Sequence, residues 1–189
     1  MHKSIRNDLY RYTGKEDLKT LISTFWKSPG FRFTFFFRLS QLTTKRSIYR
    51  IILKIFYRRY FFRYGIQLPL SVKVGGGLML PHFGGIVVNS KAKIGNNCNI
   101  LQGVTIGNAK RGKLKGAPTI GNCVYIGPNA LIIGNITIGD NVLIAGNSYV
   151  NFDVPSNSIV IGNPGNIISN ENATKGYIEN IVISAFVPR

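Results

Sequence analysis

Acidic residues, cysteine and histidine are all scarce in this chain of 189 residues. Seven Asp and Glu stand against 24 Lys and Arg, and there are two cysteines and two histidines. Cys98 and Cys123 form no CxxC pair and no dense, even pattern, which excludes a disulfide framework and a cysteine zinc site. We therefore expect both to be buried packing residues in a reducing compartment.

Long apolar runs and targeting signals are also lacking. No stretch is long and apolar enough to span a bilayer. The opening segment, MHKSIRNDLYRY, has neither an uninterrupted apolar run nor a small-residue cleavage site, so no secretory signal is predicted. We expect a cytoplasmic protein, and an apolar content of 44% favours a packed domain over disorder.

Positive charge is concentrated at the start of the chain. Residues 1–65 hold fifteen Lys and Arg against three Asp and Glu, whereas the remainder is only mildly basic. Nucleic acid, an anionic membrane surface and an acidic substrate all present dense negative charge. The composition alone does not choose among these partners.

The same segment combines its charge with bulky apolar side chains at helical spacing. Basic and aliphatic residues alternate along 48–60, and the Ser-Pro-Gly turn at 28–30 predicts a break between two helices. We expect residues 1–65 to form a basic, aromatic-rich helical region. An Arg- and Phe-rich segment more often covers a core or lies at a lipid interface than stacks on bases. We hypothesise that residues 31–64 dock against the rest of the protein and an anionic membrane, and we expect no nucleic acid partner.

Beyond residue 65 the chain repeats with a period of six residues. This period fits a solenoid in which one short strand and its turn use six residues, and three such units form one triangular coil. Aliphatic side chains then fill the axis, while Gly, Asn and Asp supply the tight turns. The sequence predicts a mainly β fold over residues 66–168, with a β-sandwich as the weaker alternative. The aliphatic positions in phase are Ile94, Ile100, Ile106, Ile120, Ile126, Ile132, Ile138, Ile144 and Val150.

One interruption separates Ile106 from Ile120 by fourteen residues instead of six. Eight residues must therefore leave the coil, and the basic segment 108–117 is predicted to project as an extended loop. Residues 169–189 have lost the repeat, and they either wrap around the coil or fray.

His82 is the single histidine of the repeat region. It is in phase with Val88 and Ile94, so either Gly84 and Gly85 distort the coil or the imidazole lies at a groove. Imidazole titrates near neutrality and can take a proton from an alcohol that attacks a carbonyl. On spacing alone, a structural histidine is the better interpretation. One histidine also cannot build a zinc site of three histidines, so no metal is predicted.

Residues 66–168 resemble the serine acetyltransferase and sugar O-acetyltransferase branch of the hexapeptide-repeat family. The resemblance rests on the segments 82–88, 100–107 and 161–165, which read HFGGIVV, ILQGVTIG and IGNPG, and on the interruption of the repeat. It implies a left-handed parallel β-helix and an acetyl-CoA-dependent O-acetyltransferase in which His82 is the general base. It also implies a homotrimer with acetyl-CoA in the groove between neighbouring coils.

The same resemblance suggests where acetyl-CoA binds. Gly107 and Asn108 open the loop near the expected pantetheine path. Ala145 and Gly146 match a small-residue turn whose backbone meets the pantetheine amides in relatives. The cations of the loop, which either meet the phosphates of coenzyme A or form a solvated surface, are Lys110, Arg111 and Lys113.

Departures from the serine enzymes shift the predicted acceptor. Those enzymes carry an Asp directly before the base and a second Asp fifteen residues earlier, where this chain has Pro81 and Gln67. They also end the loop with Arg-His-Pro, where this chain has Gly-Ala-Pro at 116–118. Because groups that orient the imidazole and bind an amino acid are missing there, we predict acetylation of a sugar or a polysaccharide precursor. Serine O-acetylation in cysteine biosynthesis is the alternative.

Overall fold

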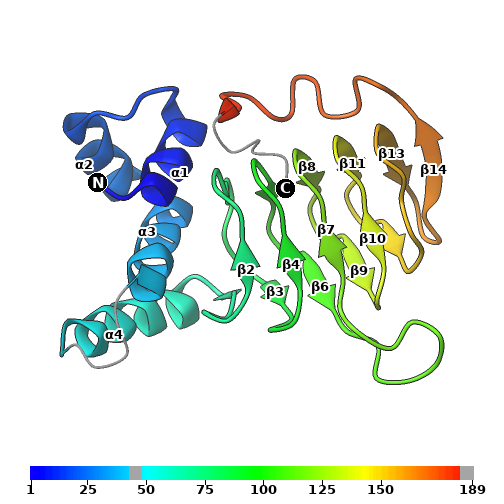
Figure 1. Ribbon diagram of the computed structural model, residues 1–189, viewed down its shortest axis with the longest axis horizontal. Coiled ribbons are helices and arrows are strands. Elements are labelled where there is room, and N and C mark those ends of the chain that lie inside the picture. Colours follow the sequence, from blue (N-terminus) through cyan, green and yellow to red (C-terminus); the bar gives the residue numbers. More distant parts are fainter. Residues whose placement is uncertain (43–47, 184–189) are drawn as a thin grey trace.

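A block of four helices stands at one end of a prism of short parallel strands (Figure 1). The computed structural model describes residues 1–42 and 48–183. Parts of the predicted helical region and of the predicted tail, at 43–47 and 184–189, lie outside the described residues. The helices are α1 (Lys3–Thr13), α2 (Leu18–Lys27), α3 (Pro29–Leu42) and α4 (Ile48–Arg63).

Three sheets form the faces of the prism, and the chain visits them in turn. Neighbouring strands in every sheet are parallel except β13 and β14, which are antiparallel. This arrangement confirms the predicted β-helix of hexapeptide repeats. Sheet A contains β1 (Ile66–Gln67), β3 (Ile86–Val88), β6 (Thr105–Gly107), β9 (Leu131–Ile133) and β12 (Tyr149–Val150). Sheet B contains β2 (Lys73–Val74), β4 (Lys93–Ile94), β7 (Thr119–Ile120) and β10 (Thr137–Ile138). Sheet C contains β5 (Asn99–Ile100), β8 (Val124–Ile126), β11 (Val142–Ile144), β13 (Ser158–Ile161) and β14 (Asn166–Ser169).

The strand register measures the length of each turn of the coil. Leu131 pairs with Tyr149, about eighteen residues later, as three six-residue units require. Thr105 pairs with Leu131, so this turn of the coil is about eight residues longer than the turn from Leu131 to Tyr149. The additional residues leave the coil between β6 and β7 as a projecting loop (Figure 1).

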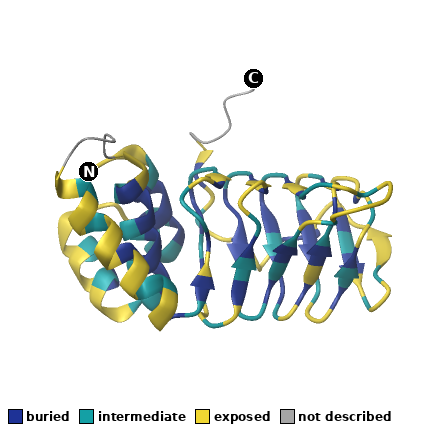
Figure 2. Ribbon diagram, turned by 90° about the horizontal axis from the view of Figure 1, so that it is seen from below, coloured by how far each residue is buried: buried dark blue, intermediate teal, exposed yellow. Residues whose placement is uncertain are grey.

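The aliphatic residues of the six-residue phase fill the axis of the prism. Ile126, Ile132 and Ile144 are fully buried, and buried residues recur along the prism from one coil to the next (Figure 2). Burial of one such side chain contributes about 1.5–3 kcal/mol to folding. Each strand is only a few residues long, so the stacked axis supplies stability that the isolated strands lack.

The helical block closes the open first end of this core. Phe33 and Phe37 of α3 are fully buried and join the same cluster as Ile66 of β1. An ion pair that is almost fully buried joins α1 to α3, with Asp8 Oδ2 2.8 Å from Arg38 Nε. Among the described residues, no helix has both the length and the apolar character needed to cross a bilayer.

The chain after β14 returns along sheet C to the helical block (Figure 1). Asparagine side chains of the coil hold its backbone. Asn141 Nδ2 donates to the carbonyl of Glu171 at 2.8 Å, and Asn99 Nδ2 donates to the carbonyl of Tyr177 at 3.1 Å. The described part of the tail therefore wraps around the coil.

Candidate active site

His82 lies on the corner of the prism where sheet C gives way to sheet A. Met79 is paired with Asn99 of β5 across about twenty residues, whereas Val87 is paired with Thr105 across about eighteen. The corner that carries His82 therefore contains two extra residues. They shift His82 out of the inward phase, and its side chain is exposed.

Two adjacent glycines allow this wider corner to close. Gly84 has φ +109° and Gly85 has φ +66°, values that side-chain-bearing residues rarely adopt. Ile86 then re-enters the core, where it is 1% exposed. The coil is distorted at Gly84 and Gly85, and the imidazole lies at a pocket on the surface.

A pocket of about 360 Å³ adjoins His82 and is built from three distant parts of the chain. Arg11 and Tyr12 come from α1, Asn99 from β5, and Glu179 from the returning tail. No described residue forms a hydrogen bond with the His82 ring, in keeping with the substitutions at Gln67 and Pro81. The other lining residues are Met79, Pro81, Leu101, Tyr125, Gly176, Tyr177 and Asn180.

Arg11 is the buried cation of this pocket. Its Nε donates to the carbonyl of Gly77 at 3.2 Å, and its Nη2 donates to Asn99 Oδ1. Its Nη1 has no hydrogen-bond partner among the described residues. Burial lowers the pKa of the Arg11 guanidinium. The pocket therefore combines a positive wall with the exposed carboxylate of Glu179.

The turns on the corner of His82 stack directly on one another, and we call this stack the histidine corner (residues 81–85, 101–103, 127–129 and 145–147). Gly103 N donates to the carbonyl of Gly84 at 2.8 Å, and Asn147 N donates to that of Pro128 at 2.8 Å. The predicted turn Ala145-Gly146 thus lies on the same corner as His82, three turns of the coil farther along.

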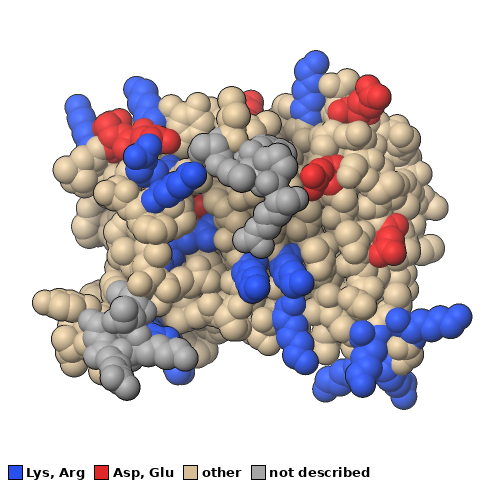
Figure 3. Space-filling view, viewed as in Figure 1, with Lys and Arg blue, Asp and Glu red and all other residues tan. Residues whose placement is uncertain are grey.

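The predicted residues of the loop gather at a different corner, between sheets A and B. Asn108 and Lys110 line a pocket of about 450 Å³ there together with Lys91 and Lys115. Asn108 Oδ1 also accepts from Asn89 Nδ2 at 3.0 Å. Figure 3 shows basic side chains gathered where the loop projects.

The other residues predicted at the loop, Lys113 and Gly107, do not line this pocket. Lys113 is exposed. Gly107 ends β6, where an added Cβ would lie 2.5 Å from Ile133 Cδ1. Sequence reasoning missed Lys91, although the coil period of about eighteen residues places it beside Ala109.

In the described part of the chain, the cysteines and the metal-binding side chains form no second site. Cys98 is fully buried, and burial raises the pKa of its thiol to about 12. Burial also raises the pKa of Cys123. Within residues 1–42 and 48–183, no group of three or more His, Cys, Asp or Glu is arranged to hold a metal ion.

Known proteins match the repeats and also most of the chain. The family described as bacterial transferase hexapeptide (six repeats) matches residues 117–151. A serine acetyltransferase of Helicobacter pylori strain 26695 is 33% identical over 143 residues, which cover 76% of this chain and 83% of that protein. The chain belongs to the serine acetyltransferase family. The prediction of an acetyltransferase is confirmed at this level.

Two further proteins show how much of this chain and of its relatives the similarity covers. A serine acetyltransferase of Synechococcus elongatus is 39% identical over 104 residues, which are 55% of this chain but only 43% of that protein. The crystal structure of the Neisseria gonorrhoeae serine acetyltransferase in complex with serine superposes with a TM-score of 0.71 at 33% identity. That match covers 88% of this chain and 68% of the other.

These similarities correct the predicted acceptor. The prediction of a sugar or polysaccharide acceptor is wrong, because the similar proteins are serine acetyltransferases and favour the alternative. The departures at Pro81, Gln67 and 116–118 affect only a few positions, whereas the similarity extends over 76% of this chain.

Proposed function

We propose that this family member transfers the acetyl group of acetyl-CoA to the hydroxyl of L-serine, with His82 as the general base. Identity of 33% over 83% of the Helicobacter pylori serine acetyltransferase carries this proposal. In the proposed reaction, the imidazole takes the hydroxyl proton while the serine oxygen attacks the thioester carbonyl. The new C–O bond forms, the C–S bond breaks, and the thiolate of coenzyme A takes the proton from the imidazolium.

The pocket beside His82 supports an amino-acid acceptor by its size and charge. Its volume of about 360 Å³ accommodates a small zwitterion. Glu179 would pair with the ammonium group, and the buried Arg11 guanidinium supplies positive potential for the carboxylate. Glu179 comes from the tail and Arg11 from α1. They would take the place of the side chains that the serine enzymes carry at the positions of Pro81, Gln67 and 116–118.

The proposed donor path follows the histidine corner from His82 towards Ala145 and Gly146. The phosphates of coenzyme A would meet the lysines of the loop, which suits charge-assisted hydrogen bonds. His82 and the loop of one chain stand at different corners of the prism, so one chain alone does not bring them together. A homotrimer in which each site uses the loop of a neighbouring chain would join them.

The reaction is tested by thiol release from acetyl-CoA with L-serine, with O-acetylserine identified by mass spectrometry. D-serine and glycine are the matched controls, because glycine has the same charged groups without the hydroxyl. Thiol release that requires L-serine supports the proposal. Thiol release that is equal with glycine, or absent with all three, overturns it.

We also propose that the protein works in the cytoplasm. A peripheral membrane contact, expected from residues 31–64, is a separate proposal, and α3 is unsuited to it because Phe31, Phe33 and Phe37 are fully buried.

A further inference from the structure

Helix α4 presents a row of apolar side chains to solvent. Ile48, Ile55 and Phe62 are 65%, 61% and 69% exposed. Ile51 and Ile52 are exposed as well, and the spacing of all five places them on one side of the helix. In a helix that only covers a core, the apolar side faces inward. The outer side of α4 therefore has the character of an interface.

The opposite side of α4 is anchored to the protein. Tyr57 is 6% exposed, and its hydroxyl donates to the carbonyl of Leu68 at 2.6 Å. Its ring packs against that of Phe33 with centroids 5.7 Å apart. The outward apolar side is thus a fixed feature of the fold, because the inner side is held by these contacts.

The charges of α4 have one sign. The helix contains no Asp or Glu and carries five basic residues, Arg50, Lys54, Arg58, Arg59 and Arg63. Arg59 and Arg63 lie among or beside the exposed apolar residues by helical spacing, and Lys54 and Arg58 lie along one flank. Such a surface suits a partner that offers both hydrocarbon and negative charge.

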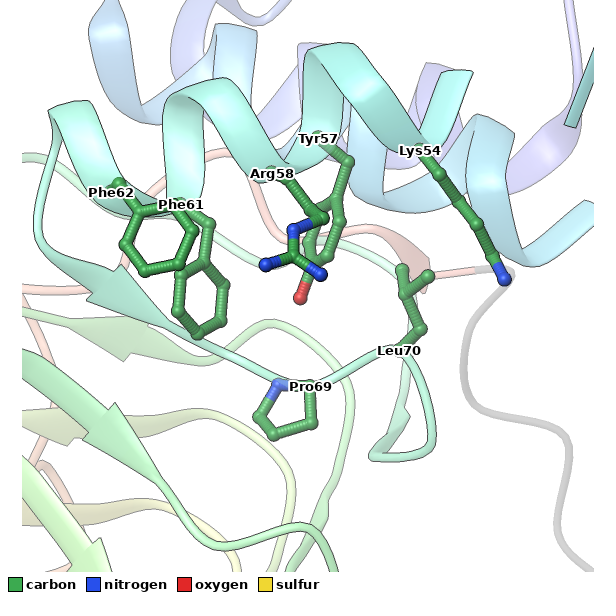
Figure 4. Close-up of a pocket in the computed structure, with 7 residues that line it drawn as sticks. All are labelled: Lys54, Tyr57, Arg58, Phe61, Phe62, Pro69 and Leu70. Atoms are coloured by element: carbon green, nitrogen blue, oxygen red, sulfur yellow. The ribbon is translucent and has the colours of Figure 1, made fainter. Parts of the chain in front are cut away.

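A groove of about 440 Å³ runs along that flank (Figure 4). Phe61, Phe62 and Leu70 give it apolar walls, while the Lys54 and Arg58 side chains extend beside it. The Arg58 guanidinium lies 5.7 Å from the centroid of the Phe62 ring. Apolar walls beside cations would accept an acyl chain of a phospholipid, while the phosphate of the same lipid remains at the surface beside the cations.

We propose that α4 binds the surface of an anionic phospholipid membrane, with its isoleucines and Phe62 among the acyl chains and its basic residues at the phosphates. This proposal does not depend on the acetyl acceptor. A second copy of the same face is disfavoured because like charges would meet. Nucleic acid is disfavoured because most of this side is formed by four isoleucines, which offer no ring for base stacking, and Phe62 is its one aromatic side chain.

The test is flotation of the full-length protein with vesicles of phosphatidylcholine alone or with about one third phosphatidylglycerol. We expect binding to the anionic vesicles only, and a decrease of at least tenfold in partitioning when salt is raised from about 0.1 M to 0.5 M. Arg58→Gln/Arg59→Gln and Ile51→Ser/Ile55→Ser should each lower partitioning at least tenfold. Lys15→Gln/Lys19→Gln removes the same charge from exposed positions outside α4. This control variant should keep most of the wild-type partitioning to anionic vesicles.

Equal binding to neutral and anionic vesicles, no binding to either, or equal effects of the α4 and control variants would overturn the proposal. Loss of the oligomer in the α4 variants at unchanged lipid binding would show instead that a second copy covers this face. Serine-dependent thiol release without vesicles, measured on the same variants, should stay at the wild-type level. Failure of that reaction in the wild type would bear on the proposed chemistry and leave the vesicle result intact.

Discussion

His82 and Gly146 lie on the same corner of the coil, although they are far apart in the sequence. The hydrogen bonds between stacked turns, from Gly103 to Gly84, from Asn129 to Gln102 and from Asn147 to Pro128, connect them. The line between them is the proposed path of the acetyl donor, with the base at one end.

The pocket at the loop that is lined by Lys91, Lys110 and Lys115 should bind the phosphates of acetyl-CoA. Replacement of Lys110 and Lys115 by Gln should raise the KM for acetyl-CoA about tenfold, because charge-assisted contacts to phosphate are lost. Steady-state kinetics with varied acetyl-CoA would measure this, with Lys175→Gln in the tail as control. The KM for L-serine should change little. An equal rise with Lys175→Gln would argue against a phosphate site at the loop.

The proposed trimer should allow two defective chains to complement each other. One chain carries His82→Ala, and the other carries Gln in place of Lys110, Arg111, Lys113 and Lys115. Co-expressed chains should form some sites that combine an intact base with an intact neighbouring loop. A fraction of the acetyltransferase activity with the wild-type KM for acetyl-CoA should therefore appear. Neither variant alone should show such activity. Its absence from mixed trimers of verified composition would mean that each site belongs to one chain.

Glu179 should contribute to acceptor binding. An exposed ion pair is worth about 0.2–1 kcal/mol, so Glu179→Gln should raise the KM for L-serine by about 1.4-fold to fivefold. The KM for acetyl-CoA should stay constant. Glu171→Gln is the matched control, because Glu171 is an exposed carboxylate of the tail outside the pocket. Unchanged serine kinetics in the Glu179 variant would remove this residue from the acceptor site.

The buried pair Asp8–Arg38 should stabilise the junction of helices and coil. Asp8 also accepts from the backbone N–H groups of Gly77 and Leu78, each at 2.9 Å. Asp8→Asn should lower the free energy of unfolding by about 3–5 kcal/mol, because it leaves a buried guanidinium without its counter-ion. Glu16→Gln breaks the exposed pair with Arg6 and should cost no more than about 1 kcal/mol. Urea denaturation of the three proteins would measure both differences.

The period of six residues predicted the coil because each unit contacts only its neighbours along the axis. Ile126 and Ile144 were placed inside from spacing alone, and both are fully buried. The extra residues at the histidine corner were not predicted, since His82 is in phase with Val88 by count. Gly84 and Gly85 indicate a possible distortion of the coil, but only the strand register shows that the corner is wider there.

Contacts between distant segments could not be predicted from local patterns. The tail reaches the coil through hydrogen bonds such as that of Asn99 with Tyr177, which no periodicity marks. Arg11 and Glu179 line the pocket of His82 for the same reason, because tertiary packing alone brings α1 and the tail together. The helical region was predicted as basic and aromatic, but the outward apolar face of α4 required the structure.

The most direct test of the account is the turnover of His82→Ala and His82→Asn with L-serine and acetyl-CoA. His2→Asn is the control, because it alters the other histidine and keeps a side chain that can cap α1. Loss of general-base catalysis should lower kcat about 10²- to 10⁴-fold in both His82 variants at unchanged stability, with His2→Asn at the wild-type rate. A kcat within about threefold of wild type in His82→Ala would contradict the assignment of His82 as the base.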